Sequence, residues 1–412
     1  MPREKTRIMT DDAYIRFVME HEGDDPGRLL LSADRWPGVD VRRAARNIAA
    51  RAKIRTKIPA WYAHPELEYP GSLPLEQASS EATALYKQAF VPDGGRIADL
   101  TGGLGVDCWF MSRRAAEAHY CERNSELCAA ARHNFAALGD ASICVHVGDG
   151  IEWLTRQTER FDLIYLDPAR RDSAARRVYD ITDCEPNLLS VKDLLLSKTV
   201  RVLAKISPMA DISRTLAQFP EARQLHVLAV SGEVKELLLI LEAGGDGEPH
   251  IVAHDIMHQS PNTPDAAATA TAHHFEFRPQ EEPAAQVHYA ESIGKFLFQP
   301  SKAVLKAGAF RLLSERYNLA KLAPSTHLYT ADTLPESFPG KRFEVESVLE
   351  WSKASIRHLK QTYEKLEMTA LNFPLATDAL RQKLGIAGGG TRHLFATTLA
   401  DGRKQIVICN NS

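Results

Sequence analysis

The sequence predicts an α/β protein built around a doubly wound parallel sheet. Between residues 96 and 218, short apolar runs alternate with segments of helical periodicity, which is the pattern of consecutive β-α units. The run at 96–100 leads directly into a turn with three glycines in four positions, and an amphipathic segment follows. A buried strand that enters such a turn and a helix N-terminus brings the backbone close to a ligand.

The glycine-rich turn begins beside an acid. Asp99 ends the strand, and the glycines are Gly102, Gly103 and Gly105. A carboxylate at this point would repel a pyrophosphate, and the turn does not follow the G-x-G-x-x-G dinucleotide pattern. S-adenosylmethionine fits better, because it carries an ammonium, a sulfonium and a ribose but no phosphate.

Three further strands end in the same way. The expected strands at 118–122, 143–147 and 161–166 end at Glu122, just before Asp149-Gly150, and just before Asp167, respectively. Ligands of open parallel sheets bind along the carboxyl ends of the strands. A single acid there is by default a helix N-cap, but capping alone does not account for four in series.

The elements that follow complete the sheet. We expect a loop at 168–186, helices at 124–138, 187–196 and 210–218, and strands at 200–206, 223–231 and 234–242. Residues 244–272 are rich in glycine, proline and small residues, which predicts a linker or a loop-rich insertion. Near the end of the chain, a helix is expected at 351–367, and Asp401-Gly402 predicts a hairpin turn between 394–399 and 405–409.

Together these residues resemble a known family. Residues 99–107 (DLTGGLGVD), Glu122, Asp149 and Asp167-Pro-Ala-Arg170 are similar to motifs I to IV of class I S-adenosylmethionine-dependent methyltransferases. The resemblance is closer to a bacterial branch with a THUMP-like C-terminal part and covers most of residues 60–412. Supporting segments are LEQASSE (75–81), CEPN (184–187), KISPM (205–209), EVKE (233–236), FPGKR (338–342) and NFP (372–374).

The resemblance implies a fold and a domain order. It implies a Rossmann-like seven-stranded sheet with one antiparallel strand, a helical lead-in and a C-terminal α+β region. The expected divisions are a helical N-terminal region at 1–70, the methyltransferase domain at 71–243, a linker with a ferredoxin-like domain at 244–340 and a THUMP-like domain at 341–412.

The resemblance also assigns cofactor-binding roles. The three glycines of the turn would admit the methionine portion, and Asp99 would accept from its ammonium, directly or through water. Glu122 would bind the ribose hydroxyls, and Asp149 would accept from the adenine amino group while Gly150 admits the ring. Thr101 is a further candidate. Asp107 is either a ligand contact or a first-turn acid favoured by the helix dipole.

Motif IV, where the methyl acceptor is expected, departs from the usual pattern. Enzymes that methylate exocyclic amines often carry an aromatic residue after Asp-Pro-Pro, whereas this chain has Asp167-Pro168-Ala169-Arg170. We take Asp167, Pro168 and Arg170 as the catalytic candidates; Asp167 accepts an amine proton or is a structural cap. Arg170 or Arg171 could stack on a base or hold a phosphate, and Tyr165 or Tyr179 could supply the missing ring.

Three nearby residues have weaker assignments. Lys205 and Ser207 end the fifth strand on the same edge and are candidates for lining the substrate pocket or contacting phosphate. Cys184 follows motif IV, and a thiolate adduct is the route to methylation of a pyrimidine carbon. A loop or buried cysteine without a chemical role is the favoured interpretation.

Composition indicates a globular enzyme without metal or membrane. The 412 residues are 44% apolar and 25% charged, and no apolar run reaches the ~20 residues of a membrane helix. The first 30 residues lack the apolar core of a signal peptide. Six scattered cysteines without C-x-x-C, and His273-His274 with side chains on opposite faces of a strand, indicate a reduced cytoplasmic protein without a metal site. The oligomeric state does not follow from the sequence.

The charge distribution points to RNA as a partner. The net charge is −3, but residues from 287 onward carry 17 Lys and Arg against 11 Asp and Glu. Residues 41–58 contain seven basic residues and no acid, which is either a solvated helix face or a phosphate contact. The leading hypothesis is methylation of a base in structured RNA, such as tRNA or rRNA, by direct in-line transfer. The alternatives are an RNA-binding protein that has kept the cofactor fold without catalysis, and a methyltransferase acting on a protein or small molecule.

Overall fold

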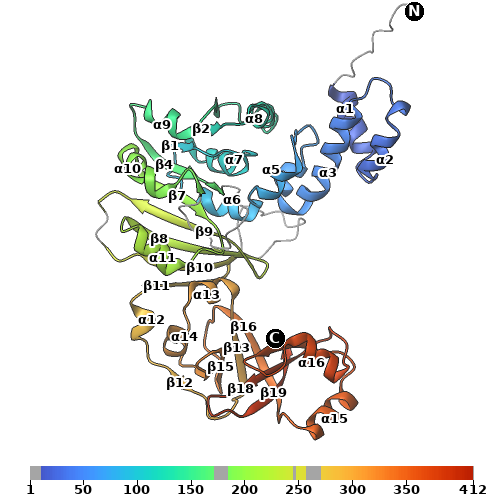
Figure 1. Cartoon of the computed structure of the whole chain (residues 1–412), viewed down its shortest axis with the longest axis vertical. Helices are drawn as coiled ribbons and strands as arrows, with labels where there is room; N and C mark the ends of the chain where they lie inside the picture. Colours follow the sequence, from blue (N-terminus) through green and yellow to red (C-terminus); the bar gives the residue numbers. More distant parts are fainter. Residues whose placement is uncertain (1–10, 171–183, 245–246, 257–270, 412) are drawn as a thin grey trace, which may run out of the picture. The chain divides into compact units, whose positions relative to one another are not determined.

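The computed structural model describes residues 11–170, 184–244, 247–256 and 271–411 (Figure 1). Within these ranges the chain forms two compact units. One comprises the described residues of 1–223 and 237–246, and the other those of 224–236, 247–257 and 270–412.

The first unit begins with a group of helices, which confirms the helical start expected from the sequence. They are α1 (Asp11–Glu20), α2 (Pro26–Leu31), a 3-10 turn (Ala33–Arg35), α3 (Val41–Lys57), α4 (Pro59–Tyr62), α5 (Ser72–Gln77) and α6 (Glu81–Gln88). The Asp40 carboxylate caps α3 by accepting from the Arg43 N–H. The apolar face of α3 packs against α1 and α2 through Val41, Ala44 and Ile48, so burial of this face stabilises the helix group.

A parallel sheet forms the centre of the first unit. Its parallel strands are β1 (Gly95–Asp99), β2 (Ala115–Glu122), β3 (Cys144–Val147), β4 (Phe161–Leu166) and β7 (Thr199–Ile206). Strand β9 (Glu233–Glu242) pairs antiparallel with β7 through its part in this unit. In the order β9-β7-β4-β1-β2-β3, strands β2 and β3 follow on one side of β1 and β4 begins the other side, so the strand order reverses between β1 and β4. Ligands of such sheets bind at that switch point.

Helices cover both faces of this sheet. They are α7 (Val106–Ser112), α8 (Ser125–Ala137), α9 (Gly150–Thr155), α10 (Leu188–Lys198) and α11 (Ile212–Gln218). Figure 1 shows α6, α7 and α8 on one side of the strands and α9 and α10 on the other. The doubly wound architecture expected from the sequence is therefore confirmed. After β4, a short antiparallel ribbon joins β5 (Ala169–Arg170) to β6 (Cys184–Glu185).

Most of β8 (Ala222–Val230) belongs to the second unit, from residue 224 onward, and the turn at Ser231-Gly232 connects this strand to β9. With β8, the β-α series has the seven strands expected, including the antiparallel β9. Two more strands follow: β10 (His250–Ile256) pairs parallel with β8, and β11 (Thr271–Phe277) pairs antiparallel with β10. Residues 244–272 were expected to form a linker or a loop-rich insertion, and this is wrong for β10. The apolar run of β10 is short, and the glycine and proline residues on either side of it favoured a loop.

The remaining residues form an eight-stranded mixed sheet with helices. Its strands are β12 (His288–Tyr289), β13 (Phe296–Pro300), β14 (Ala320–Ala323), β15 (Thr326–Ala331), β16 (Gly340–Glu350), β17 (Glu367–Leu371), β18 (Arg392–Thr398) and β19 (Lys404–Asn411). The helices are α12 (Glu281–Ala284), α13 (Lys302–Ala307), α14 (Arg311–Arg316), α15 (Lys353–Thr362) and α16 (Thr377–Leu384).

Two expectations for the C-terminal elements have different outcomes. The hairpin at Asp401-Gly402 is confirmed, because β18 and β19 pair antiparallel on either side of it and Gly402 has φ 89°. The helix expected at 351–367 is shorter than predicted. It ends at Thr362, because the next residue, Tyr363, has extended backbone angles.

Candidate active site

Asp99 lies at the carboxyl end of β1 in the interior of the protein. Its side chain is almost fully buried, and its Oδ1 accepts from the Thr101 N–H at 3.0 Å. Burial raises the pKa of Asp99 well above its ordinary value, and this hydrogen bond offsets the effect only in part; the carboxylates of Asp107 and Asp167 raise it further. An acid in this position is stabilised in its charged form by a cation, because a buried charge is costly without a partner.

The glycine-rich turn is held tightly against β2. A Cβ on Gly102 would lie 2.1 Å from Cε2 of Tyr120, so that position has no room for a side chain. Gly103 and Gly105 have φ angles of 55° and 90°, which glycine adopts without strain. The Tyr120 hydroxyl donates to the Gly103 carbonyl oxygen. Packing against Tyr120 therefore fixes where the turn runs.

Glu122 is oriented by two backbone donors. Its Oε2 accepts from the Gly103 N–H at 2.9 Å, and its Oε1 accepts from the Asn124 N–H at 2.8 Å. Each carboxylate oxygen has capacity for a second hydrogen bond. This arrangement suits a carboxylate that binds two neighbouring hydroxyls, since both oxygens are fixed in direction before a ligand arrives.

Asp149 caps a helix, the default role of an acid at a strand end, and Gly150 packs closely against the backbone. Oδ1 of Asp149 caps α9 by accepting from the N–H groups of Ile151 and Glu152, and Oδ2 accepts from the Arg123 guanidinium. Partial burial would raise the pKa of Asp149, but the backbone donors and Arg123 outweigh it and lower the pKa. A Cβ on Gly150 would lie 2.2 Å from the Leu100 carbonyl oxygen, so packing against the backbone already requires a glycine at this position.

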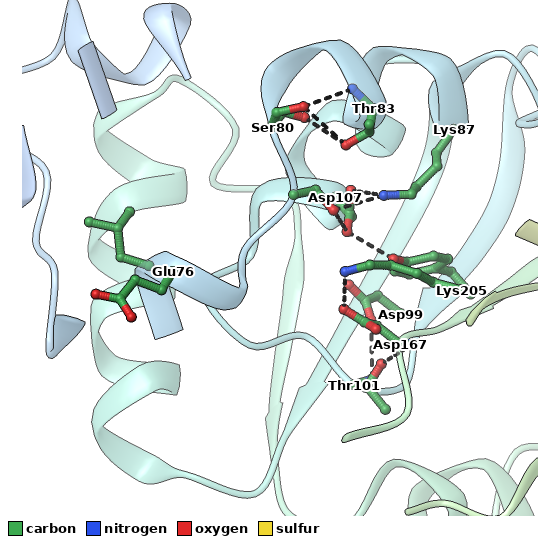
Figure 2. Close-up of polar contacts among 12 residues, drawn as sticks. Glu76, Ser80, Thr83, Lys87, Asp99, Thr101, Asp107, Asp167 and Lys205 are labelled. Atoms are coloured by element: carbon green, nitrogen blue, oxygen red, sulfur yellow. Dashed lines mark hydrogen bonds and ion pairs between the residues drawn. The ribbon is translucent and has the colours of Figure 1, made fainter. Parts of the chain in front are cut away.

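A buried polar network surrounds Asp107 on α7 (Figure 2). Oδ1 accepts from Lys87 Nζ at 2.9 Å, and Oδ2 accepts from the hydroxyls of Ser79 at 2.7 Å and Tyr165 at 2.8 Å. Sequence reasoning missed Lys87 and Ser79, because a lysine on a helix is normally expected in solvent. Tyr165 is 1% exposed and bonded to Asp107, so it does not supply the aromatic ring that motif IV lacks.

Asp167 is held at two points (Figure 2). Its backbone N–H donates to Oγ1 of Thr101 at 2.6 Å, and its Oδ2 accepts from Lys205 Nζ at 2.6 Å. Thr101 therefore joins the glycine turn to motif IV, since its own N–H donates to Asp99. The structure brings together Asp99, Thr101, Asp167 and Lys205 from three neighbouring strand ends.

Pro168 and Arg170 follow Asp167 along the chain. Pro168 is half-buried, and the backbone of Arg170 in β5 pairs with that of Cys184 in β6. Arg171 and Tyr179 lie outside the described residues. Oγ of Ser207 accepts from the Met209 N–H at 3.2 Å, so part of its hydrogen-bonding capacity is used in the turn after β7.

The basic helix α3 carries both paired and exposed basic side chains. Four of its basic side chains have partners: Arg43 bonds Glu68, Arg51 bonds Glu22, Lys53 bonds Glu76, and Lys57 donates to the carbonyl oxygens of Leu75 and Glu76. Arg42, Arg46 and Arg55 are exposed. In the described part of the chain there is no group of side chains suited to a metal ion, and no helix is long and apolar enough to cross a membrane.

Comparison with known proteins agrees with this architecture. A ferredoxin-like domain model matches residues 296–339, and a THUMP-like domain model matches 340–411. The crystal structure of a candidate methyltransferase of Porphyromonas gingivalis W83 is similar over 98% of this chain and 100% of its own, with a TM-score of 0.87 and 34% identity. Two Mycobacterium tuberculosis proteins named as uncharacterized S-adenosylmethionine-dependent methyltransferases are each 25% identical over 335 residues, which is 80% of this chain and 84% of theirs.

Proposed function

Because the chain belongs to the family of S-adenosylmethionine-dependent methyltransferases with a THUMP-like C-terminal domain, we propose that it methylates a base in structured RNA. The observation that carries the proposal is the position of Asp167. It lies at the end of β4, on the edge where ligands of such sheets bind, and both its backbone and its carboxylate are fixed by neighbours from motif I and β7.

The residues present fit the cofactor. Asp99 is a buried carboxylate whose charged form calls for a cation, and the ammonium of the methionine portion would meet that requirement. Glu122 has both oxygens directed by backbone N–H groups and suits the two ribose hydroxyls. Gly103 and Gly105 place no side chain at their own positions in the turn. When bound, S-adenosylmethionine supplies an activated methyl group, so the protein's task is binding and alignment.

Asp149 has a more restricted place in this proposal. Its Oδ1 is committed to capping α9 and its Oδ2 to Arg123. An adenine amino group would therefore share Oδ2 with the guanidinium or displace it. Gly150 contributes by letting the start of α9 lie against Leu100, which sets the position of Asp149.

On the acceptor side, Asp167 is the group with the right chemistry. A carboxylate accepts the N–H hydrogen bond of an exocyclic amine and can take up the proton that the amine releases as the new C–N bond forms. Pro168 contributes a carbonyl oxygen as a second acceptor. We assign Arg170 to stacking on the base or to a phosphate, in place of the aromatic residue found in similar motifs.

RNA is the macromolecule that best matches the basic surfaces. Residues from 287 onward have a net charge of +6, and Arg42, Arg46 and Arg55 are exposed on α3. We propose that the chain divides into a helical region (1–70), a methyltransferase domain (71–243), a linker with a ferredoxin-like domain (244–340) and a THUMP-like domain (341–412). In this proposal the helical region and the THUMP-like domain contact the RNA backbone through these charges. In this proposal the enzyme works in the cytoplasm, on tRNA or rRNA.

The direct test compares modified nucleosides in total RNA from cells with and without this protein. The loss of one methylated nucleoside, restored by the purified protein and S-adenosylmethionine in vitro, would support the proposal and identify the acceptor atom. RNA that is unchanged, together with normal cofactor binding, would favour a protein or small-molecule substrate. Failure to bind the cofactor at all would favour an RNA-binding protein without catalysis.

The basic surface can be tested separately. Replacing Arg42 and Arg46 by alanine should weaken RNA affinity and lower the slope of log K against log salt by about 1 for each phosphate that is no longer neutralised. The matched control is Lys53→Ala on the same helix, because that lysine is already paired with Glu76. Equal effects of both changes would show that the exposed arginines have no particular role.

A further inference from the structure

The ammonium group of Lys205 lies within the group of acids at the carboxyl edge of the sheet. Its Nζ is 2.6 Å from Oδ2 of Asp167, and its side chain is only 15% exposed. Its charge also acts on Asp107, where it is among the influences that lower the pKa of that carboxyl. Lys205 therefore points toward Asp167, as Figure 2 shows. This orientation does not suit contact with a phosphate in solvent.

The pairing of Asp167 with Lys205 is one half of a clamp. The other half is Thr101, whose Oγ1 receives the Asp167 N–H at 2.6 Å. Thr101 thus restrains the backbone of Asp167, while Lys205 restrains the direction of its carboxylate. A side chain held at both ends loses the rotational freedom that an aspartate on a strand end would otherwise have.

Such restraint matters because motif IV lacks its aromatic ring. Where a ring stacks on the base, it fixes the plane of the acceptor; here Ala169-Arg170 follows Pro168 and no ring is present at that position. Hydrogen bonds to Asp167 then have a larger part in setting the direction of the acceptor. Productive transfer requires the reacting groups to be within about 0.5 Å and 10–20° of the ideal geometry, which a freely rotating carboxylate does not provide.

We propose that Lys205 is a positioning residue for methyl transfer: it holds Oδ2 of Asp167 so that Oδ1 faces the acceptor. This inference rests on the proposed function and narrows it. The acceptor is then a hydrogen-bond donor, an N–H or O–H group, and not a pyrimidine carbon. It also reassigns Lys205 from a substrate phosphate contact to a partner of Asp167.

The experiment compares Lys205→Met, Lys205→Arg and the control Lys192→Met. Lys192 pairs with Glu221 at similar burial but on α10, away from the strand ends. With an RNA that the wild-type protein methylates, Lys205→Met should lower kcat about 10²-fold, the cost of a small misplacement of the reacting groups. KM for RNA and Kd for the cofactor should change less than 3-fold. Lys205→Arg should restore much of kcat, and Lys192→Met should leave it unchanged.

A double variant separates positioning from a general loss of structure. If Lys205 acts through Asp167, then Lys205→Met should add little to the defect of Asp167→Asn, because the two changes remove one interaction. A raised KM with a smaller salt slope and an unchanged kcat would overturn the proposal in favour of a phosphate contact.

Crystal structures of the wild type and Lys205→Met give a result that does not depend on activity. One ordered Asp167 rotamer in the wild type and a rotated or disordered carboxylate in the variant would support the clamp, even if RNA were not the substrate. An unchanged Asp167 rotamer in the variant would overturn it. Failure of the wild-type protein to methylate RNA would instead contradict the proposed function alone.

Discussion

Nζ of Lys87 lies 2.9 Å from Oδ1 of Asp107, and the lysine side chain has no exposure to solvent. The pair is completed by Ser79 and Tyr165, whose hydroxyls donate to the other carboxylate oxygen. Burial would raise the pKa of Asp107, but the charges of Lys87 and Lys205 outweigh it and lower the pKa. This ion pair joins α6 to α7 directly behind the glycine-rich turn.

Lys87→Met should destabilise the protein by about 3–5 kcal/mol, because removing one partner leaves the buried Asp107 carboxylate without its paired cation. Urea unfolding of the cofactor-free protein measures the effect. The control is Lys53→Met, whose pair with Glu76 is exposed on both sides and should change stability by about 1 kcal/mol or less. Equal losses for the two variants would show that the buried network contributes nothing special.

Asp99→Asn should stabilise the free protein at neutral pH while weakening cofactor binding. Because burial raises the pKa of Asp99 in the folded state, ionised Asp99 opposes folding above that folded-state pKa. The penalty decreases as the pH falls from the folded-state pKa to the unfolded value of about 3.9, and it is lost below that value, where both states are protonated. The variant's gain in Tm should therefore be present at pH 8 and vanish below the unfolded-state pKa.

Asp99→Asn should also lower the affinity for the cofactor. Loss of a hydrogen bond between charged groups costs about 1.5–3 kcal/mol, which corresponds to roughly a 10- to 150-fold rise in Kd by calorimetry. If Asp99→Asn neither raised Tm nor weakened binding, Asp99 would be an ordinary core residue and not the ammonium site.

How far the sequence predicts this site depends on the kind of interaction. The strand ends and the glycine turn follow from local patterns, so Asp99, Glu122 and Asp167 could be placed on one edge before the structure was known. The polar partners could not, because Lys87 and Asp107 are 20 residues apart and meet only when α6 packs on α7. Likewise, Lys205 reaches Asp167 across two neighbouring strands, 38 residues apart in the chain.

Local patterns also leave open why one position is a glycine. Gly150 follows Asp149, and a glycine beside a candidate adenine contact suggests space for a ring. In the structure that space is filled by the Leu100 carbonyl. A sequence shows that a position excludes a side chain, but it does not show whether ligand or backbone occupies the space.

Gly150→Ala should consequently reduce stability rather than affect the cofactor alone. The new Cβ would meet backbone at 2.2 Å, and overpacking of this kind costs about 1–3 kcal/mol or more. Gly23→Ala is the control, since nothing lies within 4 Å of its Cβ position. A Gly150→Ala protein with normal unfolding free energy but no cofactor binding would restore the original interpretation.

Asp167→Asn should separate cofactor binding from methyl transfer. Asparagine keeps the backbone N–H that donates to Thr101, and Asp167 is not assigned to the cofactor, so Kd for S-adenosylmethionine should stay within 3-fold of wild type. The asparagine side chain cannot take up a proton, and losing a positioned proton acceptor typically lowers kcat about 10²- to 10⁴-fold. Single-turnover assays with RNA from cells lacking the protein measure this.

Cys184→Ala tests methylation of a pyrimidine carbon through a thiolate adduct, and we expect this variant to keep full activity. A covalent RNA adduct that disappears in this variant would instead establish a thiolate mechanism.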